Sequence, residues 1–235
     1  MKKKIFTSIG LMSGTSMDGV DLSVIKSDGN DQFSSIYDTY KEFDDGLYKQ
    51  LISLRDKIRN FTDLKNHSKE INDVEKKFTL FNSHLINEVI GDINEDIDLI
   101  GFHGQTIHHD PDKNITIQMG DGDLLAKLCD IDVVNDFRSN DVLNGGQGAP
   151  LVPLFHQAII GDLPKPFMIL NVGGVANVSW VDEMDEVSAF DSGPGNALID
   201  DFMYQRTGSR MDQNGNLALS GKVNSRVLKK LMENL

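Results

Sequence analysis

The chain has 235 residues, of which 39% are hydrophobic, 25% charged and 7% aromatic. This ordinary globular composition excludes a disordered, collagenous or low-complexity protein. With 23 basic and 36 acidic residues, the formal net charge is −13, which argues against nucleic acid or a membrane surface as the main partner. The single cysteine, Cys129, excludes an intramolecular disulfide and a cysteine-based zinc site.

The N-terminal stretch MKKKIFTSIGLM superficially resembles a signal peptide. Its apolar run is short, is interrupted by Thr7, Ser8 and Gly10, and leads directly into an acidic motif. Elsewhere, no stretch approaches the ~20 apolar residues that a membrane span needs. We therefore expect a cytoplasmic protein that neither enters a membrane nor is exported.

Hydrophobic periodicity predicts an alternation of strands and helices. In chain order, we expect strands over 5–12, 19–27 and 34–43, helices over 45–60 and 68–91, strands over 97–102 and 115–119, a helix over 121–129 and a strand over 131–135. Beyond a Gly-rich loop, we expect a helix over 152–161, strands over 167–172, 175–181 and 186–191, and helices over 196–207 and 222–235.

The order strand, Gly-rich polar turn, strand occurs at 5–27 and again at 167–181. This repetition predicts a quasi-duplicated α/β architecture, with one domain over 1–135 and a second over 136–235. The sequence ends inside a helical pattern, KKLMENL. We therefore expect the second lobe to be incomplete.

The first turn, SGTSMDG at 13–19, combines two glycines with three hydroxyl side chains. Such a turn can direct several N–H and O–H donors at one point and so bind phosphate oxygens. The acidic Asp18 opposes a phosphate unless a cation lies between them, and Mg²⁺ is the natural candidate. The alternative is a hairpin turn that is merely rich in turn-forming residues.

The second turn contains Gly173 and Gly174, and the amide Asn177 follows it. Alone it indicates a glycine hairpin, but beside the first turn it becomes a second set of donors. Two hairpin turns facing each other across a cleft could grip one nucleotide between two halves of a duplicated fold. The sequence has neither a Walker-type phosphate loop nor a strand–GxGxxG–helix motif.

Asp191 is expected at the end of an apolar strand, just before SGPG and a helix. A carboxylate held there by rigid elements is a candidate catalytic group. The alternative is a helix N-cap or a side-chain turn.

Two further segments carry polar side chains at expected strand ends. The three histidines of HGQTIHHDP at 103–111 suggest a metal site, but their spacing matches no standard ligand pair. Contact with a ligand at the end of the strand over 97–102 is favoured instead.

Arg138 could clamp a carboxylate or phosphate with its planar guanidinium. The alternative for Arg138 is a surface ion pair with Asp141.

Together, five ordered motifs resemble the anhydro-N-acetylmuramic acid kinases. These are GLMSGTSMDGVD at 10–21, HGQTIHHDP at 103–111, DFRSNDVLNGGQGAPLVP at 136–153, LNVGGVANVS at 170–179 and FDSGPGNALIDD at 190–201. The resemblance implies an actin-like, ribonuclease H-like duplicated fold with mixed sheets flanked by helices. It also implies ATP and Mg²⁺ as cofactors, and a reaction in which water opens the 1,6-anhydro ring of 1,6-anhydro-N-acetylmuramic acid and O6 is phosphorylated during peptidoglycan recycling.

By matching motif, the resemblance assigns Asp191 as the general base, and Gln105 and Arg138 as sugar-binding residues. The residues implied to bind ATP phosphates are Gly14, Thr15, Ser16, Met17, Asp18, Gly19, Val20 and Asp21, with Gly173, Gly174 and Asn177 in the second turn. Asp18 is also the expected Mg²⁺ ligand. A homodimer is a further expectation, because an incomplete lobe exposes apolar surface.

The chain departs from the family mainly in length, since family members are longer and their remaining part contacts the adenosine. Two alternatives therefore stay open. One is a truncated, non-catalytic remnant that binds nucleotide or sugar, and the other is an actin-like phosphatase or sugar enzyme with different substrates.

Overall fold

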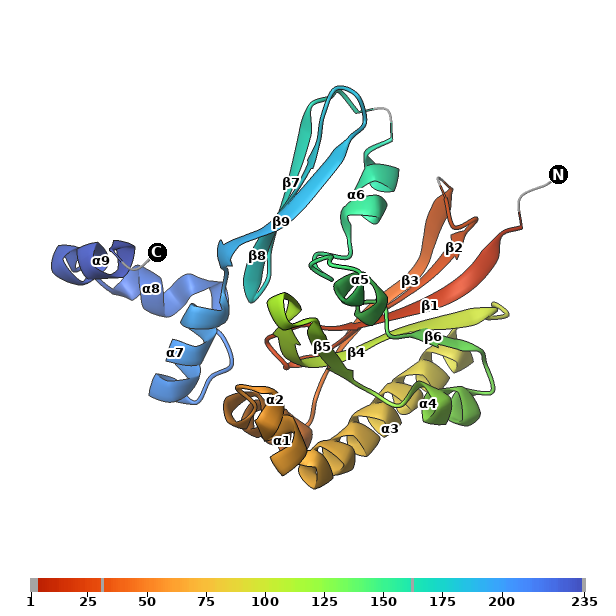
Figure 1. Cartoon of the computed structure of the whole chain (residues 1–235), viewed down its shortest axis with the longest axis horizontal. Coiled ribbons are helices and arrows are strands. Elements are labelled where there is room, and N and C mark those ends of the chain that lie inside the picture. The colour runs from red at the N-terminus through yellow and green to blue at the C-terminus, as the bar shows by residue number, and fades with distance from the viewer. Residues whose placement is uncertain (1–3, 31, 162, 234–235) are drawn as a thin grey trace.

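The computed structural model describes residues 4–30, 32–161 and 163–233. Two β-sheets stand side by side, with the long helix α3 under the first sheet and helices α5 and α6 at the connection between the two (Figure 1). The expectations that fall on residues 1–3 and 234–235, at the start of the first domain and the end of the last helix, lie outside the described residues.

The first sheet has six strands in the order β3-β2-β1-β4-β5, and β6 pairs with β4. The β1–β2 and β2–β3 pairs are antiparallel, whereas β4 runs parallel to both β1 and β6. Its strands are β1 (Phe6–Ser13), β2 (Gly19–Ser27), β3 (Phe33–Glu42), β4 (Leu99–Asp110), β5 (Ile115–Met119) and β6 (Val133–Asn135).

One face of the first sheet is covered by helices that the sequence pattern makes amphipathic. These are α1 (Asp45–Lys57), α3 (Ser68–Asp92) and α4 (Gly122–Cys129), with the short α2 (Phe61–Asn66) between α1 and α3. Alternate β1 residues Ile9 and Leu11 are buried in the same hydrophobic cluster as Phe78 and Leu85 of α3, which recur at helical spacing. The main hydrophobic core therefore lies between this sheet and its helices.

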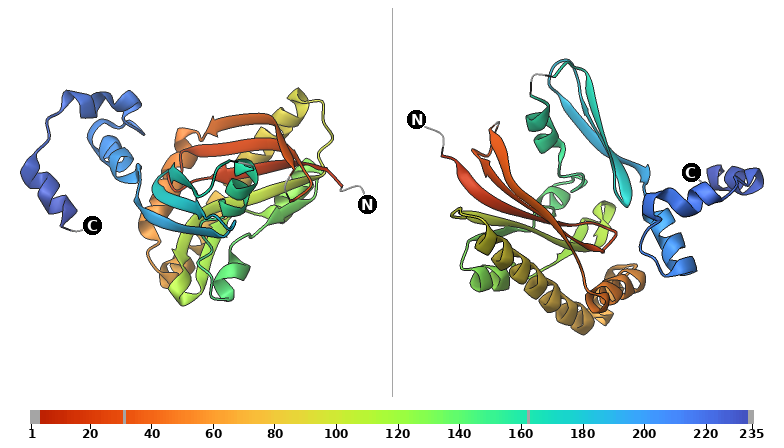
Figure 2. Two further views of the ribbon diagram at one scale, coloured as in Figure 1. Left: turned by 90° about the horizontal axis from the view of Figure 1, so that it is seen from above. Right: turned by 180° about the vertical axis from the view of Figure 1, so that it is seen from behind.

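The second unit begins with α5 (Ser139–Leu143) and α6 (Pro153–Ile160) and continues into a three-stranded antiparallel sheet in the order β7-β8-β9. Its strands are β7 (Phe167–Val172), β8 (Val175–Val181) and β9 (Val187–Pro194), and they are followed by the helices α7 (Ala197–Thr207), α8 (Asn216–Ser220) and α9 (Ser225–Met232). Short 3₁₀ turns lie at Pro111–Lys113 and Gln213–Gly215. The last helices extend away from both sheets (Figure 2).

Each of the two sheets contains an antiparallel meander, β1-β2-β3 in the first and β7-β8-β9 in the second. The parallel strands β4 and β6 extend the first meander into a mixed sheet, which is the strand order of a ribonuclease H-like unit. The mixed α/β class with helix-flanked sheets confirms the predicted fold class. Over the described residues, no helix is both long and apolar enough to cross a membrane.

Three expectations about individual elements were wrong. Strand β4 does not end at 102 but runs to Asp110, because β5 pairs with its second half after β1 and β6 leave it. Strand β9 extends past Asp191 to Pro194, since β8 continues to pair with it. Helices α2, α5 and α8 were not expected, and each has only five or six residues, too few to show a helical period.

Candidate active site

The β1–β2 turn is tightly built. Met17 adopts a left-handed conformation with φ 56° and donates its N–H to the Gly14 carbonyl at 3.2 Å. The side chains of Met17 and Val20 are buried in the core. Of these two residues, only the backbone can therefore face a ligand at the turn.

Gln105 of β4 braces this turn from below. Its side chain is fully buried, its Oε1 accepts the Ser13 hydroxyl at 2.6 Å and its Nε2 donates to the Gly14 carbonyl at 3.0 Å. The Ser13 Oγ atom also lies 2.8 Å from the Gly19 carbonyl oxygen. The Gln105 amide thus holds the turn in shape through these two hydrogen bonds, and its contact with the sugar, which the resemblance implies, stays a prediction.

The upper side of the turn offers polar groups to the crevice. The Ser16 hydroxyl donates to Asp18 Oδ1 at 2.7 Å. Within the described part of the chain, the backbone N–H groups of Thr15 and Ser16 donate to no protein acceptor. These two N–H groups are free to bind an anion.

Asp18 shapes the electrostatics of its surroundings. Asp21 lies on the exposed face of β2, where partial shielding of its carboxyl from water and the Asp18 charge raise its pKa. The pKa of Tyr40 is raised by burial, by the Asp18 charge and by a hydrogen bond to Asp18. Burial and the same charge also raise the pKa of Asp200 on α7. A cation beside Asp18 would relieve this accumulation of negative charge.

The β7–β8 turn meets the first turn directly. A Cβ atom on Gly174 would lie 2.5 Å from the Thr15 Oγ1 atom, so any larger residue here would require the Thr15 side chain to move. The turn is also joined to α7, because its two carbonyls accept the N–H groups of Gly195 at 2.9 Å and Asn196 at 2.8 Å. The two hairpin turns, remote in sequence, therefore form opposite walls of one junction.

Asp191 lies inside β9, opposite Asn177 of β8. Helix α7 begins only at Ala197, with Asn196 at its N-cap position, so the alternative of an N-cap or local turn for Asp191 was wrong. Asp191 is exposed, and its charge acts on both Arg138 and His109. The buried Asn177 Oδ1 accepts no hydrogen bond from the described residues.

Arg138 is fixed by the segment that follows β6. Its Nε donates to His103 Nε2 at 2.9 Å and its Nη1 donates to the Gly148 carbonyl. Asp141 accepts the Gly148 N–H at 2.7 Å and so is a partner of this loop, not the surface ion-pair partner of Arg138 that the alternative reading expected. Burial lowers the pKa of Arg138, whereas the Asp191 charge raises it.

His103 and His109 complete this cluster, and the sequence did not single out either as part of a network with Arg138. His103 donates from Nδ1 to the Gly104 carbonyl at 2.8 Å and accepts from Arg138 at Nε2, so its ring is neutral. Burial, with a smaller effect of Arg138, lowers the pKa of His103 to about 4. Burial and the Arg138 charge also lower the pKa of His109, whereas the Asp191 charge raises it.

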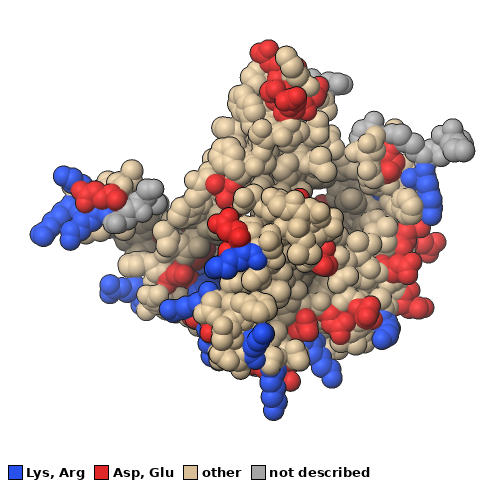
Figure 3. Space-filling view, in the orientation of Figure 1, with Lys and Arg blue, Asp and Glu red and all other residues tan. Residues whose placement is uncertain are grey.

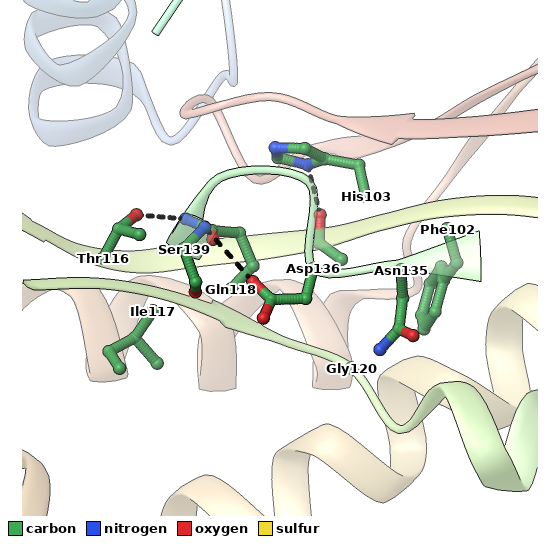
Figure 4. Close-up of a pocket in the computed structure, with 10 residues that line it drawn as sticks. Phe102, His103, Thr116, Ile117, Gln118, Gly120, Asn135, Asp136 and Ser139 are labelled. Carbon is green, nitrogen blue, oxygen red and sulfur yellow. Dashed lines mark hydrogen bonds between the residues drawn. The ribbon is translucent and has the colours of Figure 1, made fainter. Parts of the chain in front are cut away.

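A cavity of about 190 Å³ opens beside this cluster, between β4, β5 and the segment after β6. His103 points toward its upper rim, while Gln118, Asp136 and Ser139 form its polar side and Phe102 its apolar end (Figure 4). Asp136 Oδ1 accepts the Ser139 N–H at 3.4 Å. The cavity is thus polar and is connected to Arg138 through His103.

The described residues contain no group of three or more His, Cys, Asp or Glu side chains arranged to hold a metal ion. Mg²⁺, however, is commonly held by one or two carboxylates together with substrate phosphates. Asp18, next to unpaired N–H groups and near Asp200, fits that arrangement. In Figure 3, acidic side chains are visible at the tip of the upper projection and along the right of the lower body, and basic side chains lie mainly along the lower edge and over the last helices at the left.

The fold is that of a mixed α/β protein with two sheets, in which the turns at Thr15 and Gly174 meet and Asp191 of β9 lies close enough to Arg138 and His109 to shift their pKa values. The family model for anhydro-N-acetylmuramic acid kinase matches residues 6–235. The chain therefore belongs to the anhydro-N-acetylmuramic acid kinase family.

Individual relatives agree with this assignment. The anhydro-N-acetylmuramic acid kinase of Pelagibacter ubique is 44% identical over 236 residues, which cover 99% of this chain and 63% of that protein. The corresponding kinase of Agrobacterium fabrum is 39% identical over 241 residues, which cover 98% and 64%. The chain thus spans about three fifths of the length of the curated relatives it matches. Among solved structures, a Ppx/GppA phosphatase of Aquifex aeolicus aligns over 86% of this chain and 56% of that one, with a TM-score of 0.38 and 10% identity.

Proposed function

We propose that this chain provides the turns, the base and the sugar-binding arginine of an ATP-dependent kinase for 1,6-anhydro-N-acetylmuramic acid. The product would be N-acetylmuramic acid 6-phosphate, formed in the cytoplasm during peptidoglycan recycling, and the enzyme would act as a homodimer. The observation that carries the proposal is the meeting of Thr15 and Gly174 beside the strand of Asp191.

In the proposed site, the free N–H groups of Thr15 and Ser16 hold phosphate oxygens of ATP, and the Gly174 turn closes the other side. Asp18 and Asp200 would hold Mg²⁺ between the turn and α7. When bound, Mg²⁺ neutralises charge on the phosphate oxygens. The domain division at 135–136 is part of the proposal, since it places one turn in each unit.

Asp191 would act on water. Its carboxylate takes a proton from the water molecule as the water oxygen bonds to the anomeric carbon, and the bond from that carbon to O6 breaks with its electron pair going to O6. The released O6 then bonds to the γ-phosphorus of ATP, and the bond from that phosphorus to the β–γ bridging oxygen breaks with its electron pair leaving on ADP. Arg138, held by His103 and Gly148, would orient the sugar with its planar guanidinium.

The decisive experiment incubates the protein with Mg-ATP and the anhydro-sugar in ¹⁸O-labelled water. Mass spectrometry should show a sugar phosphate with one ¹⁸O at the anomeric carbon and an equal amount of ADP. Asp191→Asn should lower kcat by about 10²–10⁴-fold or more with ATP binding nearly intact, whereas the exposed Glu183→Gln should behave as wild type. Near-normal turnover of Asp191→Asn would rule out this base.

A second pair of variants tests the shared junction. Gly174→Ala places a methyl group 2.5 Å from Thr15 Oγ1 and should weaken ATP binding several-fold, because the Thr15 side chain must move. Gly91→Ala is the control, since Gly91 is exposed on α3 and nothing lies within 4 Å of its Cβ position. Binding of ATP and sugar without any product would instead support the non-catalytic alternative.

A further inference from the structure

Arg210 lies just beyond α7 and reaches back to the first unit. Helix α7 is followed directly by Gly208, which has a left-handed conformation with φ 75° that favours glycine and turns the chain back. The Arg210 guanidinium is largely shielded, with its side chain 21% exposed. The helix end therefore directs a cation from the second unit into the surface of the first.

The guanidinium of Arg210 contacts four oxygen atoms of the first unit. Its Nη1 lies 3.4 Å from the Asp18 carbonyl and 3.4 Å from Glu42 Oε2. Its Nη2 lies 3.2 Å from the Phe43 carbonyl and 3.1 Å from Asp45 Oδ1. A planar guanidinium can satisfy such a spread of acceptors, whereas a lysine ammonium acts as a single point.

These acceptors come from three elements that meet at one place: the β1–β2 turn, the end of β3 and the start of α1. The Asp18 carbonyl also accepts the Phe43 N–H at 2.9 Å, so Arg210 adds to a bond that already fixes the turn. Below this cluster, the Arg210 Cζ atom lies 4.3 Å from the centroid of the Tyr48 ring, a cation–π contact.

Two weaker contacts continue the same seam between the units. Tyr204 of α7 packs edge-on against Tyr48, with ring centroids 5.7 Å apart, and Arg55 Nη1 lies 3.3 Å from Asp201 Oδ1. A small cavity of about 40 Å³ lies in this seam and is lined by both Asp18 and Arg210. Arg210 is thus next to the candidate phosphate and Mg²⁺ residues without being one of the anion-binding donors.

We propose that Arg210 is a positioning residue that clasps α7 to the β1–β2 turn and thereby sets the width of the crevice. Helix α7 follows β9, and the Gly173–Gly174 turn accepts the N–H groups at the helix start. Fixing the helix therefore also fixes the strand that carries Asp191 relative to the turn that carries Asp18. The catalytic consequence rests on the proposed function, but the clasp itself does not.

The test compares Arg210→Met, Arg210→Lys and a control, Arg206→Met. Met keeps the length of the side chain but removes the four hydrogen bonds and the charge, and Lys restores the charge without the planar fork. Arg206 is exposed on the same helix and stacks on Phe202 of that helix at 5.4 Å, so its loss leaves the seam intact.

The first measurement is the distance distribution between spin labels at two exposed positions, Asn87 on α3 and Glu183 in the β8–β9 turn, in a Cys129→Ser background. Arg210→Met should broaden and lengthen the distribution, Arg210→Lys should lie between, and Arg206→Met should match wild type. A distribution for Arg210→Met that equals that of Arg206→Met would overturn the proposal.

The second measurement is kinase turnover with ATP and the anhydro-sugar. Displacing the base from the phosphate site should lower kcat of Arg210→Met by about 10–100-fold, with a smaller change in KM for ATP and partial recovery in Arg210→Lys. An unchanged kcat together with a widened crevice would contradict the positioning role. If wild type shows no turnover, the proposed function fails, while the label distances still decide whether Arg210 is the clasp.

Discussion

The two units of this molecule are packed very differently. All buried members of the main core cluster lie between Ile9 and Leu125, in the first sheet and its helices. The second unit buries few apolar side chains, and Leu154, Leu219 and Val223 are 77%, 81% and 81% exposed. The first unit is therefore held by its own core, whereas the second is held largely by its backbone ladder and by contacts with the first.

This contrast matters for the candidate site, because each unit contributes one turn. The first turn is fixed from beneath by the buried Gln105, which belongs to the first unit itself. The position of the second turn and of Asp191 depends on the seam formed by Thr15, Gly174 and Arg210. Small changes in the seam should therefore affect chemistry more than stability, and changes in the core the reverse.

The largest expected effect is on the core of the first unit. Phe78 is 1% exposed and lies between the rings of Phe43 and Phe102, at centroid distances of 5.8 and 6.0 Å. Phe78→Ala should lower the free energy of unfolding by about 3–5 kcal/mol, because it leaves a cavity in a close-packed core. Urea unfolding followed by circular dichroism measures this.

The matched variant in the second unit is Phe202→Ala, at a side chain that is 51% exposed. Its cost should stay below about 1 kcal/mol, as for most surface substitutions. If Phe78→Ala and Phe202→Ala lowered the free energy of unfolding equally, the second unit would have a core of its own and the difference between the units would not hold.

A pH-dependent effect of similar size should come from His103. Its pKa is about 4 in the fold against 6.5 as the ordinary value, so between these pH values the unfolded chain binds the proton and the folded chain does not. Stability should thus fall as the pH decreases from about 6.5 toward 4, by roughly 3 kcal/mol in total from this residue.

His103→Gln isolates this contribution, since glutamine does not titrate and its amide oxygen can accept from Arg138. The difference in unfolding free energy between wild type and variant should change with pH only in that window. A difference that stays constant from pH 7 to pH 4 would mean that His103 has the same pKa in the folded and unfolded chains, so that it becomes protonated below about 6.5 in the fold and loses its bond from Arg138.

An intermediate effect on stability is expected from Gln105, whose side chain holds the first turn in place. Gln105→Met keeps the volume but removes the amide that donates to the Gly14 carbonyl and accepts the Ser13 hydroxyl, so the carbonyl keeps only the Met17 N–H, which should cost about 1–3 kcal/mol. Gln205→Met, at an exposed position of α7, is the control and should change stability little. An equally small change for Gln105 would show that water replaces its amide under the turn.

Sequence patterns predicted most of the fold because long elements carry a clear period. The helix over 68–91 and the strand over 19–27 were placed within one residue, since apolar side chains recur along their buried faces. The strand predicted over 97–102 ended too early, because Gly104, with φ 76°, interrupts the apolar run at the place where β4 changes pairing partners. A single sequence shows no such exchange of partners.

For the site, the sequence pointed to both turns, and the structure brings Thr15 and Gly174 together. It did not show that Gln105 is buried or that His103 accepts from Arg138, because both facts depend on how β4 lies under β1 and beside the segment after β6. Arg210 carried no signal at all: its partners lie 165–192 residues away in the chain. Contacts between units of a fold leave no local pattern.

The smallest expected effect on stability concerns an ion pair in the seam between the two units. Arg55 and Asp201 form an ion pair at 3.3 Å, with side chains 32% and 48% exposed. Arg55→Met should cost only about 0–1 kcal/mol and the cost should decrease further in high salt, because solvent screens such pairs. The exposed pair of Lys57 and Glu70, within the first unit, is the matched comparison and Lys57→Met should give a similar value. Were Arg55→Met to cost several times more than Lys57→Met, the seam would be a main source of stability and the second unit would depend on electrostatics as much as on the clasp at Arg210.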